Sequence, residues 1–179
     1  MDTDSVSYYA TFDNKGVGTT IGKYVEKSLG LAEGKGPYNI EFFAGSPDDN
    51  NAHFLNAGVF EVLQPYIDKG QLVCPSGQTD FNTICTLRWS QETAQKRMED
   101  IISGYYTDGK KLDVVISPFD GISYGIAAAL EGAGYQVGTN WPLITGQDAE
   151  LMATKNILSG KQSMTVFKDT RILADKCVT

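Results

Sequence analysis

The chain has 179 residues, a formal net charge of −7 and 41% hydrophobic residues, which suits one globular domain with a buried core. Its basic residues are scattered, with Lys110-Lys111 as the longest run, so we expect no nucleic-acid partner. No apolar stretch approaches the roughly 20 residues that span a bilayer, and no export signal follows Met1. We therefore expect either a cytosolic protein or a trimmed piece of an exported one.

The first part of the chain alternates short apolar segments with amphipathic ones. Residues 8–12 read as a strand, Asp13 stands at an N-cap position, and apolar residues at helical spacing carry a helix to Gly30. Residues 39–44 form the second expected strand. The helix after it turns apolar side chains inward, namely Phe54, Leu55, Val59, Val62 and Leu63.

The alternation continues to the end of the chain. Further strands are expected at 71–74, 112–116, 142–145 and 164–167, with an aperiodic loop over 75–88. Helices follow this loop and the next two strands, and one more begins near Thr170. Six β–α units predict an α/β fold, a doubly wound parallel six-stranded sheet with helices on both faces.

Ligands of such sheets bind outside the carboxyl ends of the strands. The predicted strands deliver acids, amides, a lysine and aromatic rings to this edge. Carboxylates and amides pair with sugar hydroxyls, and flat rings cover the apolar face of a pyranose. The edge therefore indicates a carbohydrate site, with these candidates: Asp13, Asn14, residues 48–51, Asp80, Asn82, Trp89, Phe119, Asp120, Gln147, Asp148, Lys168 and Asp169.

Each candidate also has a purely structural interpretation. Trp89 fits a packing residue at a helix start, and Lys168 fits an ordinary solvated lysine. The pattern alone favours helix capping for five acids, which are Asp13, Asp49, Asp120, Asp148 and Asp169.

Patterns typical of catalysis and metal binding fail in this sequence. Ile21 stands where the glycine-rich segment 16–22 would need the third glycine of a dinucleotide fingerprint, so close helix packing explains these glycines better. No phosphate-binding loop and no nucleophile elbow occur. Cys74, Cys85 and Cys177 lack metal spacing. The sequence allows a disulfide between Cys74 and Cys85, but it favours three reduced cysteines whose thiols are at least partly buried. We expect a binding module without enzymatic activity, cofactor or metal.

Five ordered motifs occur at residues 45–52, 63–68, 117–121, 145–150 and 164–168. Together they resemble the xylose-binding and multiple-sugar-binding proteins that serve ABC importers of monosaccharides. The resemblance implies one lobe of a two-lobed, type I periplasmic binding protein. It assigns residues 8–168 to the C-terminal sugar-binding lobe and residues 169–179 to the start of a helix of the missing N-terminal lobe.

The resemblance also implies the residues that contact the sugar. After the fourth strand, either Phe119 or Asp120 touches the ligand, where xylose binders usually have an asparagine. Asn56 stands where some relatives have an arginine contact. The other implied sugar contacts are Asp49, Asn51, Trp89, Asp148 and Lys168.

The partners implied by the resemblance are an aldose, the permease of an ABC importer, and a sensor kinase or chemoreceptor. The implied location of the full-length protein is the periplasm or the cell surface as a lipoprotein, with the export signal absent from this chain. An alternative function is the effector-sensing lobe of a sugar-responsive transcription repressor, which shares this fold.

Overall fold

The computed structural model describes Ser5 and residues 8–178. Its sheet consists of β1 (Tyr38–Phe42), β2 (Leu72–Val73), β3 (Val114–Ile116) and β4 (Leu143–Ile144), in the order β2-β1-β3-β4 with all pairs parallel. The predicted α/β class and parallel sheet are confirmed. The predicted six strands are wrong, because the sheet formed by the described residues has four strands.

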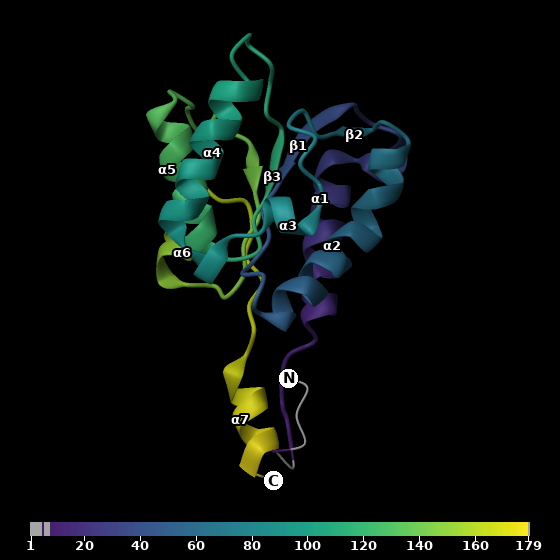
Figure 1. The fold of residues 1–179 in the computed structure, drawn as a ribbon, viewed down its shortest axis with the longest axis vertical. Helices are drawn as coiled ribbons and strands as arrows, with labels where there is room; N and C mark the ends of the chain where they lie inside the picture. The colour runs from purple at the N-terminus through teal and green to yellow at the C-terminus, as the bar shows by residue number, and fades with distance from the viewer. Residues whose placement is uncertain (1–4, 6–7, 179) are drawn as a thin grey trace.

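Helices cover both faces of this sheet, as predicted (Figure 1). α1 and α2 pack on one face, and α4 and α5 pack on the other. The helices are α1 (Asn14–Leu29), α2 (Asn50–Asp68), α3 (Phe81–Ile84), α4 (Gln91–Tyr105), α5 (Asp120–Gly132), α6 (Leu151–Leu158) and α7 (Thr170–Val178), with 3₁₀ turns η1 (Leu31–Glu33) and η2 (Leu87–Trp89).

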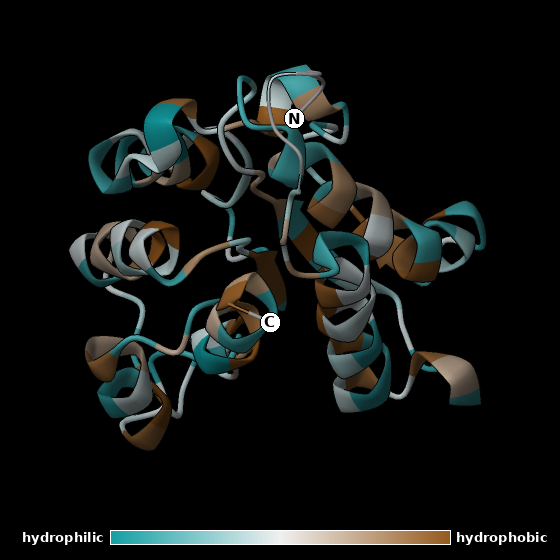
Figure 2. Cartoon of the chain, turned by 90° about the horizontal axis from the view of Figure 1, so that it is seen from below, coloured by the Kyte–Doolittle hydropathy of each residue, from teal (hydrophilic) through white to brown (hydrophobic). Residues whose placement is uncertain are grey.

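The two hydrophobic cores follow from the alternation of side chains along each strand. On β3, Val114 and Ile116 face the core beneath α1 and α2, whereas Val115 faces the core beneath α4 and α5. All three side chains are buried, so the strand is apolar on both faces, as expected for a parallel sheet. Figure 2 shows hydrophobic strand segments at the centre, with the helices around them.

Glycines bring the backbones of α1 and α2 together. A Cβ atom on Gly18 would lie 1.9 Å from the carbonyl oxygen of Leu55, and one on Gly58 would lie 2.1 Å from that of Lys15. The glycine-rich segment of α1 therefore serves helix packing, as the sequence predicted.

The first and last of the six predicted strands do not form. Residues 8–12 have no regular structure, and Tyr8 is 95% exposed. None of the described strands pairs with them. Residues 164–167 contribute only an isolated bridge between Val166 and Gln147. The predicted loop 75–88 contains α3 and the start of η2.

Two segments leave the sheet at the same edge (Figure 1). Residues 8–12 enter α1 there, and residues 165–169 lead to α7, which projects away from the sheet. Their proximity is shown by Lys168, whose Nζ lies 5.5 Å from the centre of the Phe12 ring. In the part of the chain that the structure describes, no helix is long and apolar enough to cross a membrane.

Candidate functional site

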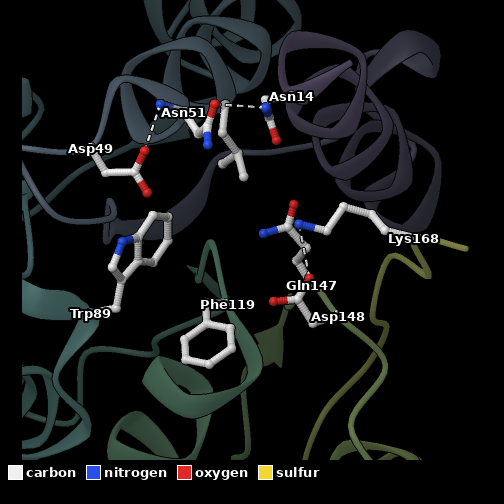
Figure 3. Close-up of a pocket in the computed structure, with 9 residues that line it drawn as sticks. Asn14, Asp49, Asn51, Trp89, Phe119, Gln147, Asp148 and Lys168 are labelled. Atoms are coloured by element: carbon white, nitrogen blue, oxygen red, sulfur yellow. Dashed lines mark hydrogen bonds and ion pairs between the residues drawn. The ribbon is translucent and has the colours of Figure 1, made fainter. Parts of the chain in front are cut away.

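A pocket of about 350 Å³ opens where the loops after β1, β2, β3 and β4 meet the starts of α1 and α2 (Figure 3). It lies at the carboxyl edge of the sheet, where the topology places ligands. The pocket contains every sugar contact that the family resemblance implies except Asp120. Of the wider set of candidates at this edge, six others do not line it, namely Asp13, Asp48, Asn50, Asp80, Asn82 and Asp169. Its lining residues are Asn14, Asp49, Asn51, Leu55, Trp89, Phe119, Gln147, Asp148 and Lys168.

One wall is built by the starts of α1 and α2. Asp49 is the N-cap of α2, and its Oδ1 accepts a hydrogen bond of 2.9 Å from the Asn51 backbone N–H. The Asn51 Oδ1 accepts a hydrogen bond of 2.9 Å from Asn14 Nδ2, which joins the two helices. Asp49 both caps a helix and lines the pocket (Figure 3). The two roles are compatible because the cap uses only one of its carboxylate oxygens.

Two aromatic rings form a second part of the wall. The half-buried rings of Trp89 and Phe119 meet edge to face, with centroids 6.1 Å apart and planes at 86°. The Trp89 ring packs directly on Gly45, where an added Cβ would lie 2.1 Å from ring carbon Cη2. Such rings present an apolar surface to the C–H groups of a ligand.

The third part of the wall carries charge. Lys168 Nζ lies 2.9 Å from Asp148 Oδ1, and this ion pair is partly exposed. Beside it, the buried Gln147 donates from Nε2 to the carbonyl oxygen of Pro118 at 3.3 Å. The Oε1 atom of Gln147 accepts no hydrogen bond from any described residue. It is a buried acceptor beside the pocket, suited to a ligand that donates a hydrogen bond.

Asp120 lies behind the pocket, fully buried. Its Oδ2 accepts hydrogen bonds from the Glu150 N–H at 2.9 Å and from Thr165 Oγ1 at 3.1 Å, and its Oδ1 accepts one from Gln162 Nε2 at 2.8 Å. Burial raises the pKa of the Asp120 carboxyl above its usual value, and these hydrogen bonds oppose the rise. Of the two candidates after the fourth predicted strand, Phe119 is the one that lines the pocket.

Three of the five acids that were predicted to cap helices do so, and two do not. Asp13 and Asp49 cap α1 and α2, and Asp169 accepts a hydrogen bond from the Arg171 N–H at the start of α7. Asp120 and Asp148 are not caps. The N-cap of α5 is Phe119, because Asp120 is already the first helical residue, and Asp148 lies two residues before the N-cap of α6.

Three lining residues were not among the predicted contacts. Asn14 and Gln147 belong to the polar edge in the sequence, but nothing local distinguishes them from its other members. Leu55 lies one helical turn after Asn51, so it belonged to the expected apolar face of α2.

The cysteines offer no covalent link. Cys74, Cys85 and Cys177 are all free thiols, but Cys177 is exposed, contrary to the expectation of partial burial. Among Ser5 and residues 8–178, no cluster of three or more His, Cys, Asp or Glu side chains is arranged to hold a metal ion.

A family model described as a periplasmic binding protein domain matches residues 1–179. The chain belongs to the periplasmic binding protein family. Among curated members, it is 53% identical over 173 residues to the multiple sugar-binding periplasmic protein SbpA of Azospirillum brasilense, covering 96% of this chain and 48% of that protein. It is 32% identical over 170 residues to the D-xylose-binding periplasmic protein of Escherichia coli, covering 95% and 46% of the two chains.

A solved ABC transporter solute-binding protein shares the same fold. It is an ABC transporter solute-binding protein from Clostridium phytofermentans with bound β-D-glucose, with a TM-score of 0.92 and 50% identity, covering 99% of this chain and 54% of that one. The predicted family resemblance is therefore confirmed. The chain spans about half the length of the curated relatives it matches.

Proposed function

We propose that the chain is the sugar-binding half of an extracytoplasmic receptor for a monosaccharide ABC importer. The observation that carries the proposal is the pocket in which charged groups, amides and two aromatic rings converge (Figure 3). A cavity of about 350 Å³ lies at the small end of ordinary ligand sites, which suits a small ligand. Its acceptors and donors match sugar hydroxyls, and its rings match a pyranose face.

The ligand in this proposal is an aldose such as glucose, galactose, xylose or arabinose. The proposal draws support from the glucose-bound relative and from the names of the multiple-sugar and xylose binders. Asp148 and Gln147 Oε1 accept hydrogen bonds from hydroxyls, and Lys168 donates one. The remaining proposed contacts are Asp49, Asn51, Trp89 and Phe119.

The proposed organisation is one lobe of a two-lobed receptor. Residues 8–168 form the C-terminal lobe, and residues 169–179 begin a helix of the other lobe. Residues 8–12 and 165–169 leave the sheet side by side, at the edge that carries the pocket. This arrangement supports the proposal that the chain crosses between the lobes at these two segments. The proposed partners of the whole receptor are the importer permease and a sensor kinase or chemoreceptor, and its proposed location is outside the cytoplasm.

The alternative function is the effector-sensing lobe of a transcription repressor. The two curated relatives described above are named as periplasmic sugar-binding proteins, which favours the receptor. The same names favour binding over catalysis, so we propose that the chain does not turn over its sugar.

A titration of the ¹⁵N-labelled 179-residue chain with each of the four aldoses tests this function. We expect shifts of the backbone amides of Asp49, Trp89 and Asp148, with a Kd of about 1 mM or weaker. The affinity is weak because one lobe supplies only part of the hydrogen bonds and leaves them open to water. The full-length protein should bind at least one aldose far more tightly by calorimetry.

Two variants make the test specific. Asp148→Ala and Trp89→Ala should each weaken binding in the full-length protein by about tenfold or more. Asp113→Ala is the matched control, because Asp113 accepts the Asn39 N–H at the opposite edge of the sheet. If the full-length protein binds none of the four aldoses, or binds one unchanged after both pocket substitutions, the proposed function is wrong.

A further inference from the structure

The pocket is bordered by backbone in an unusual conformation. Among the described residues, four that are not glycine have positive φ, and they form two pairs. Arg88 (56°) and Trp89 (54°) precede α4, and Asp148 (95°) and Ala149 (52°) precede α6. Residues with a Cβ atom are disfavoured in this region and persist only where surrounding contacts hold them.

The pair before α6 is held by three successive backbone amides. The Asp148 N–H donates to the Val166 carbonyl oxygen at 2.9 Å, and the Ala149 N–H donates to Thr165 Oγ1 at 3.0 Å. The Glu150 N–H donates to Asp120 Oδ2 at 2.9 Å. Each residue of this turn therefore forms a hydrogen bond to a segment distant in sequence.

Asp120 takes part in several of these contacts. Besides the Glu150 N–H, its Oδ2 accepts from Thr165 Oγ1, the same hydroxyl that accepts from Ala149. On the other side of the turn, the Asp120 N–H donates to the Gln147 carbonyl oxygen at 3.1 Å. One buried residue thus contacts the backbone just before Asp148 and just after Ala149.

The surroundings of Asp120 leave it little freedom. Its Oδ1 is engaged by Gln162 Nε2 at 2.8 Å. A Cβ atom added to Gly146 would lie 2.3 Å from the same Oδ1, so the backbone approaches this carboxylate closely. A side chain held this firmly can serve as a fixed anchor for the turn.

We propose that Asp120 is a positioning residue of the sugar pocket: its carboxylate holds the left-handed turn at Asp148 and Ala149 and so directs the Asp148 carboxylate toward Lys168 and the ligand. Asp120 itself does not touch the sugar, since it lies outside the pocket lining. The inference rests on the proposed function, because it treats the pocket as a sugar site. It also gives a role to Asp120, for which the sequence allowed either a ligand contact or a helix cap.

The chemistry of Asp120 separates anchoring from charge. Alanine at this position removes the acceptor for the Glu150 N–H. Asparagine can keep its oxygen toward that N–H if its NH₂ group faces Gln162 and the Gln162 amide turns over. Oε1 of Gln162, which accepts no hydrogen bond from any residue described here, then accepts from this NH₂ group, and the bond from Nε2 to the Met164 carbonyl oxygen is lost in exchange. Asp120→Asn should therefore preserve the turn, whereas Asp120→Ala should not.

The experiment measures the turn and the binding together, in the 179-residue chain by NMR and in the full-length protein by calorimetry. In Asp120→Ala, we expect hydrogen exchange of the Ala149 and Glu150 amides to speed up at least tenfold, and the Kd for glucose to rise about tenfold. Asp120→Asn should stay within about threefold of the unaltered chain in both measurements. Asp113→Ala should change neither, although it also removes an acceptor of a backbone N–H.

A glycine provides the second test. Glycine adopts positive φ without a Cβ penalty, so Ala149→Gly should restore most of the affinity that Asp120→Ala loses. Because this glycine also relieves strain in the folded state, the thermal unfolding of the double variant is compared with its Kd, and Ala149→Gly alone should leave the Kd of the unaltered protein within about threefold. Because a variant of a buried acid can unfold, thermal unfolding is recorded for each. If the alanine variant is unfolded, Asp120→Ser takes its place with the same expected changes, because its hydroxyl is too short to reach the Glu150 N–H.

The outcomes are distinct. Unchanged amide exchange and unchanged Kd in a folded Asp120→Ala overturn the proposal. An Asp120→Asn variant as impaired as Asp120→Ala also overturns it, because the charge and not the anchoring geometry would then matter. If the unaltered protein binds no aldose, the proposed function fails, and the exchange rates of the Ala149 and Glu150 amides still decide whether Asp120 holds the turn.

Discussion

Replacing Gly18 with alanine should destabilise the protein, although alanine is the better helix former. The added Cβ would meet the Leu55 carbonyl oxygen at 1.9 Å, the Leu55 carbonyl carbon at 2.9 Å and the Val59 nitrogen at 3.0 Å. These are backbone atoms of α2, so no side-chain rotation relieves the contact. Ordinary packing at about 3.5 Å requires α1 and α2 to separate by roughly 1.5 Å.

The expected magnitude follows from two opposing effects. Overpacking against rigid backbone costs about 3 kcal/mol, the upper part of the usual range, and the higher helix propensity of alanine returns about 1 kcal/mol. The free energy of unfolding should fall by about 2 kcal/mol, which lowers the Tm by roughly 4–8 °C for a chain of this size. The separation should also stretch the 2.9 Å hydrogen bond between Asn14 and Asn51 at the pocket.

Urea unfolding followed by circular dichroism measures this effect. Gly104→Ala is the matched control, because Gly104 lies in α4 and a Cβ added there would meet no heavy atom within 4 Å. That substitution should stabilise the protein by about 0.5 kcal/mol through helix propensity alone. The packing argument is refuted if Gly18→Ala is as stable as the unaltered chain, or if both alanine variants shift stability in the same direction.

Three further outcomes are expected. Gly45→Ala should displace the Trp89 ring, which lies 2.1 Å from the added Cβ, and weaken glucose binding by about 3–10-fold with little loss of stability; unchanged affinity in a calorimetric titration would contradict this. Burial raises the pKa of Asp120 in the folded state, so the folded protein holds this proton at pH values where the unfolded chain has lost it. The free energy of unfolding, measured relative to that of Asp120→Asn, should therefore fall as the pH rises from about 3.9 to the raised pKa. Urea unfolding that shows no such fall across this range would contradict the prediction. Exposed Cys177 should react with a thiol reagent much faster than Cys74, whose pKa burial raises; equal rates would rule this out.

The alternation of strands and helices was readable from the sequence because it depends on short-range periodicity. Apolar residues recur at helical spacing in α1 and α2, and the strands at β1 and β3 are short apolar runs. The caps at Asp13 and Asp49 were predicted for the same reason, since a cap joins residues two or three positions apart. Most of the pocket wall followed from the rule that strand ends meet at one edge.

The strand count was decided by tertiary structure. A strand needs a partner, and apolar composition does not reveal one. Residues 8–12 carry strand-like side chains but pair with no strand that the structure describes, whereas residues 164–167 reach Gln147 through one bridge only. The same segment supplies Thr165 and Val166 to the turn before α6.

The roles of individual acids also depended on the folded chain. Asp49, Asp120 and Asp148 all precede or begin helical segments, so local pattern gave them the same interpretation. In the structure, Asp49 caps a helix at the pocket, Asp148 pairs with Lys168 from a left-handed turn, and Asp120 is buried beneath that turn. The difference arises because the partners of the Asp120 and Asp148 carboxylates lie 20 to 45 residues away, beyond the reach of any local rule.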